Sequence, residues 1–132
     1  MKHESIIVVY DSCQAVAEEI AGMLGAETVS VQSVNNRHIE NSHSFVLAVE
    51  YQSDGQLTPH WQYAFQTICR ADLSGKCFAV FIALGNNKNH SCCNELCAEL
   101  EHNKAQIVGE QPYAGNPAWN LDNWVCSISP NL

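Results

Sequence analysis

Apolar runs that end at glycine or polar residues alternate along the chain with stretches of helical period. Runs rich in β-branched residues predict strands, and apolar side chains three or four positions apart predict helices. The five expected strands cover Ser5–Tyr10, Thr28–Val34, Phe45–Tyr51, Cys77–Leu84 and Gln106–Gly109. Helices are expected at Val16–Leu24 before Gly25, in at most one turn around Ile39, and at Trp61–Ala71, Cys92–Asn103 and Trp119–Ile128. This alternation indicates βαβ units.

The run Cys77–Leu84 is the most informative segment, because it is apolar throughout and too short to span a membrane. It follows the turn residues Asp72–Lys76 and breaks at Gly85, so it is predicted to be a strand buried on both faces. Strands of this type belong to parallel sheets. In an open parallel sheet the ligand crevice lies beyond the carboxyl ends of the strands, so Leu84–His90 is the first place to look for a function.

The composition bounds both the fold and the partners. A chain of 132 residues with 46% hydrophobic content is expected to form one compact α/β domain. Fourteen acidic against six basic side chains give a formal net charge of −8, which disfavours nucleic acid and anionic membranes. The first residues lack the pattern of a secretion signal and no run reaches the length of a membrane helix, so a cytoplasmic monomer is expected.

Several segments together resemble short-chain flavodoxins in their order and spacing, over nearly the whole chain. They are Asp54–Leu57, Trp61–Phe65, Asp72–Lys76, Gly85–Asn87, Ala105–Gly109 and Trp124–Val125. The resemblance implies a flavodoxin-like doubly wound five-stranded parallel sheet of strand order 2-1-3-4-5, with helices on both faces. It also implies FMN, held by three loops at the carboxyl edge of the sheet.

The resemblance places the expected FMN contacts in those three loops. The loop after the first strand supplies Asp11, Ser12, Cys13, Gln14, Ala15, Val16 and Ala17. The loop after the third strand supplies Glu50, Tyr51, Gln52, Ser53, Asp54 and Gly55. The loop after the fourth strand supplies Leu84, Gly85, Asn86, Asn87, His90 and Cys93.

The first of these loops departs from the family pattern S-x-T-G-N-T, in which backbone N–H groups and hydroxyls hold the phosphate. A gapless match places Ser12–Ala17 there, where Ser12 keeps a hydroxyl and Gln14 can donate an amide hydrogen. Asp11 adds a negative charge, and the glycine, the asparagine and a hydroxyl residue are replaced by Ala15, Val16 and Ala17. Each lost hydrogen bond to a charged group is worth about 1.5–3 kcal/mol, so FMN would bind weakly. An ordinary strand-to-helix turn capped by Ser12 or Asp11 is the alternative.

The other two loops depart as well. Gln52 stands where an aromatic ring commonly covers one face of the isoalloxazine, and the adjacent Tyr51 points the opposite way in an extended segment. Ser53–Gly55 is a turn with or without a cofactor. In the third loop, which resembles G-D-Q-x-x-Y, His90 falls at the stacking tyrosine. An imidazole over the flavin would make its affinity pH-dependent, whereas a solvated loop histidine is the alternative.

The seven cysteines are predicted to be reduced and mostly buried thiols without a disulfide framework, because their number is odd and no export signal precedes them. His90, Cys93 and Cys97 resemble three ligands of a metal site at helical spacing. No fourth ligand has a diagnostic spacing, and cysteine packs well beneath a helix, so no metal is expected.

The leading hypothesis is a small acidic FMN-binding electron carrier, in which the cofactor does the redox chemistry and the chain is not an enzyme with its own substrate. Its expected partners are redox proteins with basic docking patches. The alternative is a flavodoxin fold that has lost FMN and serves as a binding or regulatory module, which the altered loops would allow. No nucleophile elbow, P-loop or HExxH motif supports catalysis by side chains.

Overall fold

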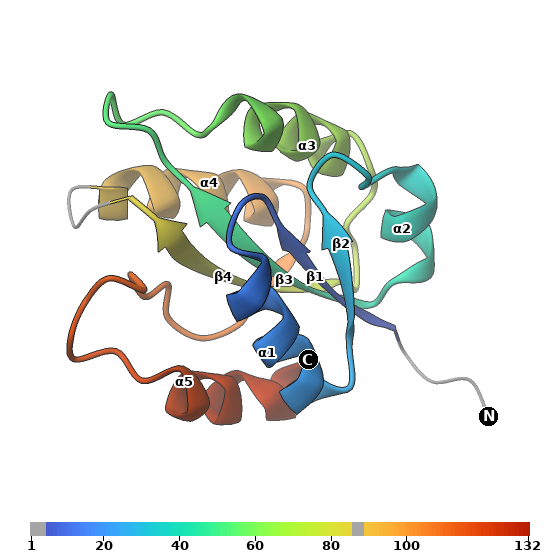
Figure 1. The fold of residues 1–132 in the computed structure, drawn as a ribbon. Helices are drawn as coiled ribbons and strands as arrows, with labels where there is room; N and C mark the ends of the chain where they lie inside the picture. The colour runs from blue at the N-terminus through green and yellow to red at the C-terminus, as the bar shows by residue number, and fades with distance from the viewer. Residues whose placement is uncertain (1–4, 86–88) are drawn as a thin grey trace.

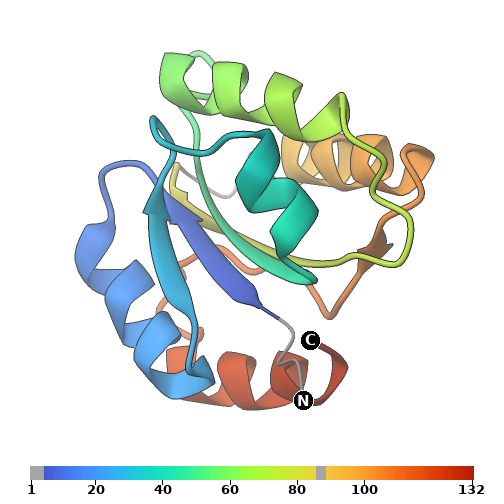
Figure 2. The same ribbon diagram turned by 90° about the vertical axis from the view of Figure 1, so that its right-hand side faces the viewer.

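The computed structural model describes residues 5–85 and 89–132, and its centre is a five-stranded parallel sheet (Figure 1, Figure 2). The strand order is β2-β1-β3-β4-β5, which confirms the order that the flavodoxin resemblance implied. In this order the strands are β2 (Glu27–Ser30), β1 (Ile6–Tyr10), β3 (Ser44–Glu50), β4 (Cys77–Leu84) and β5 (Gln106–Ile107).

Helices cover both faces of the sheet (Figure 1), as expected. Helices α2, α3 and α4 pack on one face, and α1 and α5 pack on the other, because their buried residues belong to two separate cores. Among the described residues no helix is long and apolar enough to cross a membrane. The helices are α1 (Gln14–Leu24), α2 (Asn36–Asn41), α3 (Pro59–Cys69), α4 (His90–His102) and α5 (Leu121–Ile128), followed by the 3₁₀ helix η2 (Ser129–Asn131).

Strand β3 lies at the centre of the sheet and is buried along its whole length. Its side chains alternate between the two faces, as the period of a strand requires. Phe45 and Leu47 enter the core beneath α2, α3 and α4, whereas Val46 and Ala48 enter the core beneath α1 and α5. A strand that is apolar on both faces needs helices on both faces, so β3 sets the layered architecture.

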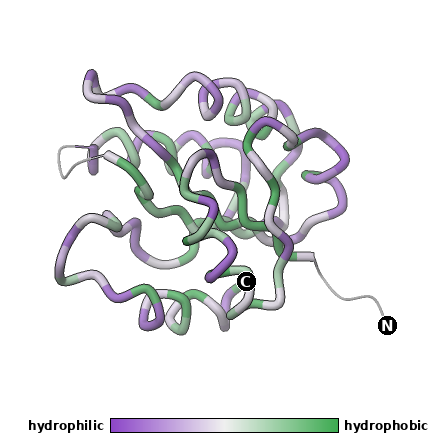
Figure 3. The backbone as a smooth tube through the Cα atoms, in the orientation of Figure 1, coloured by the Kyte–Doolittle hydropathy of each residue, from purple (hydrophilic) through white to green (hydrophobic). Residues whose placement is uncertain are grey.

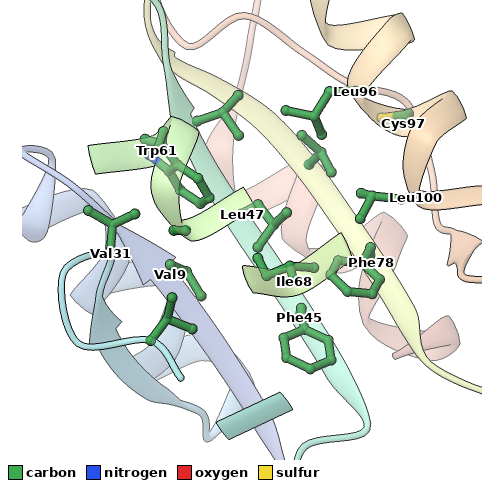
Figure 4. Close-up of a cluster of buried hydrophobic side chains, with 14 of the residues drawn as sticks. Val9, Val31, Phe45, Leu47, Trp61, Ile68, Phe78, Leu96, Cys97 and Leu100 are labelled. Atoms are coloured by element: carbon green, nitrogen blue, oxygen red, sulfur yellow. The ribbon is translucent and has the colours of Figure 1, made fainter. Parts of the chain in front are cut away.

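The core beneath α2, α3 and α4 is the larger of the two. Figure 4 shows Trp61 and Ile68 of α3 above the sheet near Leu47, with Leu96 and Leu100 of α4 beside β4. The strands are the most hydrophobic parts of the chain, and the helices mix apolar and polar positions (Figure 3). Burying this apolar surface contributes about 25 cal/mol per Å², which is the main force that holds the layers together.

The boundaries of β4 agree with the sequence, but β2 is shorter than the expected Thr28–Val34. After Ser30 the chain turns, because Val31 N donates to Tyr10 O at 2.7 Å and Ser33 N donates to Ser30 O at 2.8 Å. Val31 and Val34 are nevertheless buried. The alternation of β-branched residues therefore continues into a buried turn, which sequence periodicity cannot distinguish from a strand.

Helices α1, α3 and α4 each begin two residues before the sequence prediction, and capping residues determine the starts of α2 and α5. The expected turn around Ile39 is the helix α2, in which Asn35 Oδ1 accepts from His38 N at 3.1 Å and His38 Nδ1 accepts from Asn35 N at 3.2 Å. Helix α5 begins at Leu121 rather than Trp119, because Asn120 Oδ1 accepts a hydrogen bond from the third residue of the helix.

Strand β5 ends at Ile107, two residues before the expected Gly109. Gly109 has a φ of 72°, which favours glycine, and there the chain leaves the sheet. It returns beside the carboxyl end of β4, where Ile82 N donates to Pro112 O and Ala114 N donates to Ile82 O, both at 2.9 Å. The segment between β5 and α5 thus extends the sheet edge without forming a regular strand.

Candidate functional site

The connection between β1 and α1 has only three residues, Asp11–Cys13. Of the residues expected to contact a phosphate, Gln14, Ala15, Val16 and Ala17 lie in the first turn of α1 rather than in the connection, and their contact with a phosphate stays a prediction. The side chain of Ala17 is fully buried in the core beneath α1 and α5 and cannot reach a ligand. The connection is shorter than the S-x-T-G-N-T pattern to which it was matched.

The amides at the start of α1 are hydrogen-bonded to the carboxylate of Glu50. Ser12 N donates to Oε2 at 2.7 Å, Cys13 N donates to the same oxygen at 3.3 Å, and Ser12 Oγ donates to Oε1 at 2.7 Å. Glu50 is only 2% exposed. Two backbone N–H groups and a hydroxyl at a helix N-terminus are the donors that a phosphate group would use. The chain's own carboxylate takes the position of that anion.

Glu50 reaches the start of α1 because it is the last residue of β3. It continues the alternation of Val46 and Ala48, which face the side of the sheet that α1 covers. The pairing of β3 with β4 shifts register between Val49 and Glu50, so Glu50 lies opposite Leu84. A buried carboxylate without partners would be strongly unfavourable, so the three donors of the β1–α1 connection are what allow its burial.

Asp11 is held by the segment that leads into α3. Thr58 Oγ1 donates to its Oδ2 at 3.0 Å, and His60 Nδ1 lies 3.2 Å from its Oδ1. His60 in turn lies 2.9 Å from the side-chain amide of Gln32, in the turn after β2. Sequence analysis did not identify Thr58, His60 or Gln32, and no spacing in the chain relates them. Together with Glu50, these side chains link the carboxyl ends of β1 and β3 to the turn after β2 and to the start of α3.

The second loop is a tight turn, as expected for Ser53–Gly55. Gly55 has a φ of 87° and its N donates to Gln52 O at 2.9 Å, while Gln56 N donates to Asp54 Oδ1 at 3.0 Å. The side chains of Gln52, Ser53 and Asp54 are exposed. They are free to contact a partner, but Gln52 supplies no aromatic surface.

The ring of Tyr51 is buried and is not part of the molecular surface at the carboxyl edge of the sheet. Only 5% of it is exposed, and its ring belongs to the core beneath α2, α3 and α4. Its backbone N donates to Leu84 O at 2.8 Å, and the residue forms an isolated antiparallel bridge with Leu57. The inclusion of Tyr51 among the flavin contacts stays a prediction, and the burial of its ring on the inner side of an extended segment argues against it.

The third loop is described only at its ends, and the expected contacts Asn86 and Asn87 lie outside the described residues. Leu84 is 51% exposed. The carbonyl of Gly85 accepts a hydrogen bond from Tyr113 Oη at 2.8 Å, so the returning segment after β5 supports this loop. His90 is exposed at the first position of α4, and it lines a cavity of about 630 Å³ together with Tyr113 and Trp119.

Cys93 is fully buried beneath α4, which argues against the predicted contact with a cofactor. A hydrogen bond with Cys97 and burial raise the pKa of Cys93, which keeps it a thiol. Burial and the Glu50 carboxylate likewise raise the pKa of Cys13. All seven cysteines are free, and within residues 5–85 and 89–132 no three His, Cys, Asp or Glu side chains gather as a metal site.

The FMN that the resemblance implies does not fit this edge at its phosphate end. The amides of Ser12 and Cys13 already have an acceptor, and a phosphate dianion would approach the carboxylates of both Asp11 and Glu50. Displacing Glu50 would leave its charge without these donors, which is costly for a buried carboxylate. One signal in the sequence could have pointed to this role: a glutamate at the end of a doubly buried strand needs a strong hydrogen-bonding partner.

Comparison with known proteins bears on the fold. No protein-family model and no curated protein matches the sequence. Solved structures do match. Oxidised flavodoxin 1 from Bacillus cereus superposes with a TM-score of 0.79 at 18% identity, covering 98% of this chain and 99% of that one. A Fusobacterium nucleatum flavodoxin bound to flavin mononucleotide gives 0.78 at 15% identity, with the same coverage of 98% and 99%.

A short-chain flavodoxin associated with a non-canonical PDU bacterial microcompartment gives a TM-score of 0.80 at 12% identity, over 98% of this chain and 99% of that one. Identities this low establish architecture rather than chemistry, because the loops that carry function vary independently of the fold. The strand order, the helices on both faces and the near-complete coverage agree with one another. This chain is a flavodoxin-like protein in its fold.

Proposed function

We propose that this protein is a flavodoxin-fold binding module that works without FMN. The observation that carries the proposal is the Glu50 carboxylate, which accepts the hydrogen bonds of Ser12 and Cys13 at the start of α1. An internal anion of this kind competes with any phosphate for the same donors, and it is always present. The short β1–α1 connection supports the proposal further, because the Ser12 hydroxyl within it is also bonded to Glu50.

The distribution of charge supports a protein partner at the carboxyl edge of the sheet. Asp11, Asp54 and Glu110 follow β1, β3 and β5, on the edge where flavodoxin folds bind their ligands. Of the four described lysines and arginines, three lie near the opposite, amino edge: Arg70, Lys76 and Lys104. We therefore propose that a partner with a basic patch docks at the carboxyl edge, with an affinity that falls as salt concentration rises.

A second candidate function is the FMN-dependent electron carrier. The observation in its favour is the likeness to a flavodoxin bound to flavin mononucleotide, over 98% of this chain. In that case the chain's residues would have to bind and shield the flavin, while the cofactor would supply the redox chemistry. Glu50 would have to leave the start of α1, and it could then act only as a negative charge near the cofactor.

A flavin titration separates the two functions. With 1 μM FMN as fluorophore and protein added to about 100 μM, we expect no saturable quenching, since the Ser12 and Cys13 amides are already bonded to Glu50. Riboflavin, which lacks the phosphate, is the matched control and is expected to behave like FMN. In ¹⁵N–¹H spectra the amide signals of Ser12 and Cys13 are expected to stay in place with either compound.

FMN binding would be detected by the same two measurements. Saturable quenching at micromolar protein, with FMN bound at least ~10-fold more tightly than riboflavin, would show a phosphate site and establish the carrier. A shift of the Ser12 and Cys13 amides on FMN addition would place the phosphate at the start of α1. Either finding would overturn the proposal that Glu50 holds this position permanently.

A further inference from the structure

A cavity of about 370 Å³ lies between α3 and α4, away from the start of α1. The two helices lie side by side on the same face of the sheet in both ribbon views (Figure 1, Figure 2). Leu57, Phe65 and Leu96 give the cavity apolar walls, and the chain between β3 and α3 closes one end. The volume falls within the range of small-molecule sites.

Tyr51 lines this cavity, and its hydroxyl is buried without a hydrogen-bond partner among the described residues. The residue is 5% exposed, and no atom of the described residues forms a hydrogen bond with its Oη. The backbone of Tyr51 is fixed by hydrogen bonding to Leu84 and by the bridge to Leu57, and its side chain is part of the buried core. A buried donor without an acceptor is unfavourable and rare in native proteins, which makes a bound acceptor its natural complement.

The donor character of this hydroxyl is secure. Burial is the main cause that raises the pKa of Tyr51, and the neighbouring Cys93 and Cys92 act in the same direction. The group therefore keeps its proton at neutral pH and can donate it to a carbonyl or ether oxygen. Tyr51 and Cys93 of α4 belong to the same buried core.

The rim of the cavity carries two acidic side chains, and no described lysine or arginine pairs with them. Glu95 and Glu99 lie one helical turn apart on α4, both are exposed, and neither forms an ion pair within the described part of the chain. Like charges at this spacing weaken a helix. None of the described residues that line the cavity is a lysine or arginine. A cation at the rim would relieve this repulsion.

From the three features we infer that the α3–α4 cavity binds a small organic cation with an apolar body and a hydrogen-bond acceptor. The apolar body would pack between Phe65 and Leu96, the acceptor would take the proton of Tyr51 Oη, and the cationic group would lie between Glu95 and Glu99. Because the hydroxyl is shielded from water, binding also requires a flexible lining side chain, such as that of Gln56, to move aside. This inference specifies a ligand for the proposed binding module.

The test uses L-phenylalaninamide, which combines an aromatic ring, an ammonium group and a carbonyl. We expect saturable shifts of the Cys92, Leu96 and Phe65 amides in ¹⁵N–¹H spectra, with a Kd near ~1 mM for so small a compound. Phenylacetamide, which lacks the cation, is expected to bind about 2–5-fold more weakly, since exposed ion pairs contribute little.

Two variants assign the contacts. Tyr51→Phe removes the unpartnered hydroxyl without changing the ring, and it is expected to weaken L-phenylalaninamide binding about 2–10-fold, the range for one neutral hydrogen bond. Its melting temperature is expected to equal or exceed that of the wild type, because an unsatisfied donor has gone. The surface variant Glu95→Gln/Glu99→Gln is expected to bind phenylacetamide normally and L-phenylalaninamide no better than phenylacetamide.

The inference is overturned if no amide around the cavity shifts, or if both variants bind L-phenylalaninamide as the wild type does. This outcome is distinguishable from failure of the FMN-free function, because that failure appears at the amides of Ser12 and Cys13. FMN binding at the start of α1 would not determine whether the amides around the α3–α4 cavity shift with L-phenylalaninamide. The two experiments therefore have independent readouts.

Discussion

Replacing Glu50 with alanine is expected to lower the free energy of unfolding by about 3 kcal/mol, the typical cost of removing one partner from a buried charged hydrogen-bonding group. The amides of Ser12 and Cys13 and the hydroxyl of Ser12 all lose their acceptor. The effect is measured by urea unfolding, in which the midpoint should fall while the slope is unchanged. A loss of this size would be a large share of the stability of a small domain.

Two controls accompany this variant. Glu50→Gln keeps the shape and one oxygen acceptor, so it is expected to lose roughly half as much, about 1.5 kcal/mol. Glu19→Ala removes an exposed carboxylate from α1 and is expected to change stability by less than about 0.5 kcal/mol. If Glu50→Ala proved as stable as Glu19→Ala, the carboxylate would not hold the start of α1, and the main support for an FMN-free function would be lost.

Replacing Phe81 with alanine is expected to destabilise the protein by about 4 kcal/mol, as usual for a large aromatic residue in a core. Phe81 is fully buried, and its ring lies 5.7 Å from that of Trp119 and 5.3 Å from that of Trp124, centroid to centroid. This cluster holds the returning segment and α5 against β4. The near-ultraviolet circular dichroism of the two tryptophans should therefore weaken even where the variant is still folded.

Phe81→Leu is the matched control, because it keeps an apolar side chain but removes the ring. Its expected cost is about 1.5 kcal/mol, with part of the tryptophan dichroism retained. Equal stability of wild type and Phe81→Ala would mean that the two tryptophans pack without β4. If the loss of stability were confined to α5, tryptophan fluorescence would detect an unfolding transition separate from the main one.

Most strands and helices could be predicted from the sequence, because they follow from strong patterns. β4 is apolar along its length and bounded by turn residues, so its range was predicted without error. The amphipathic helices α3 and α4 have regular apolar spacing, and their predicted ranges were displaced by only one or two residues. Resemblance to flavodoxins then supplied the order of the strands, which periodicity alone does not determine.

The candidate site was less predictable because its contacts join residues far apart in sequence. Glu50 was recognised as part of the second loop, but its bond to Ser12 spans 38 positions and depends on the register of β3. The pair of Asp11 and His60 is separated by 49 positions and appears only once α3 is placed. A gapless match also assumed a loop of the family's length, and the early start of α1 at Gln14 contradicts this.

The glutamate at the end of β3 also bears on how the protein behaves when flavin is scarce. A fold whose helix N-terminus binds a nucleotide gains a stability that rises with the logarithm of the nucleotide concentration above its Kd. Here the negative charge is covalently attached and cannot be diluted, exported or consumed. The chain should therefore melt at the same temperature in riboflavin-starved and riboflavin-fed cells, and its abundance should follow synthesis rather than vitamin status.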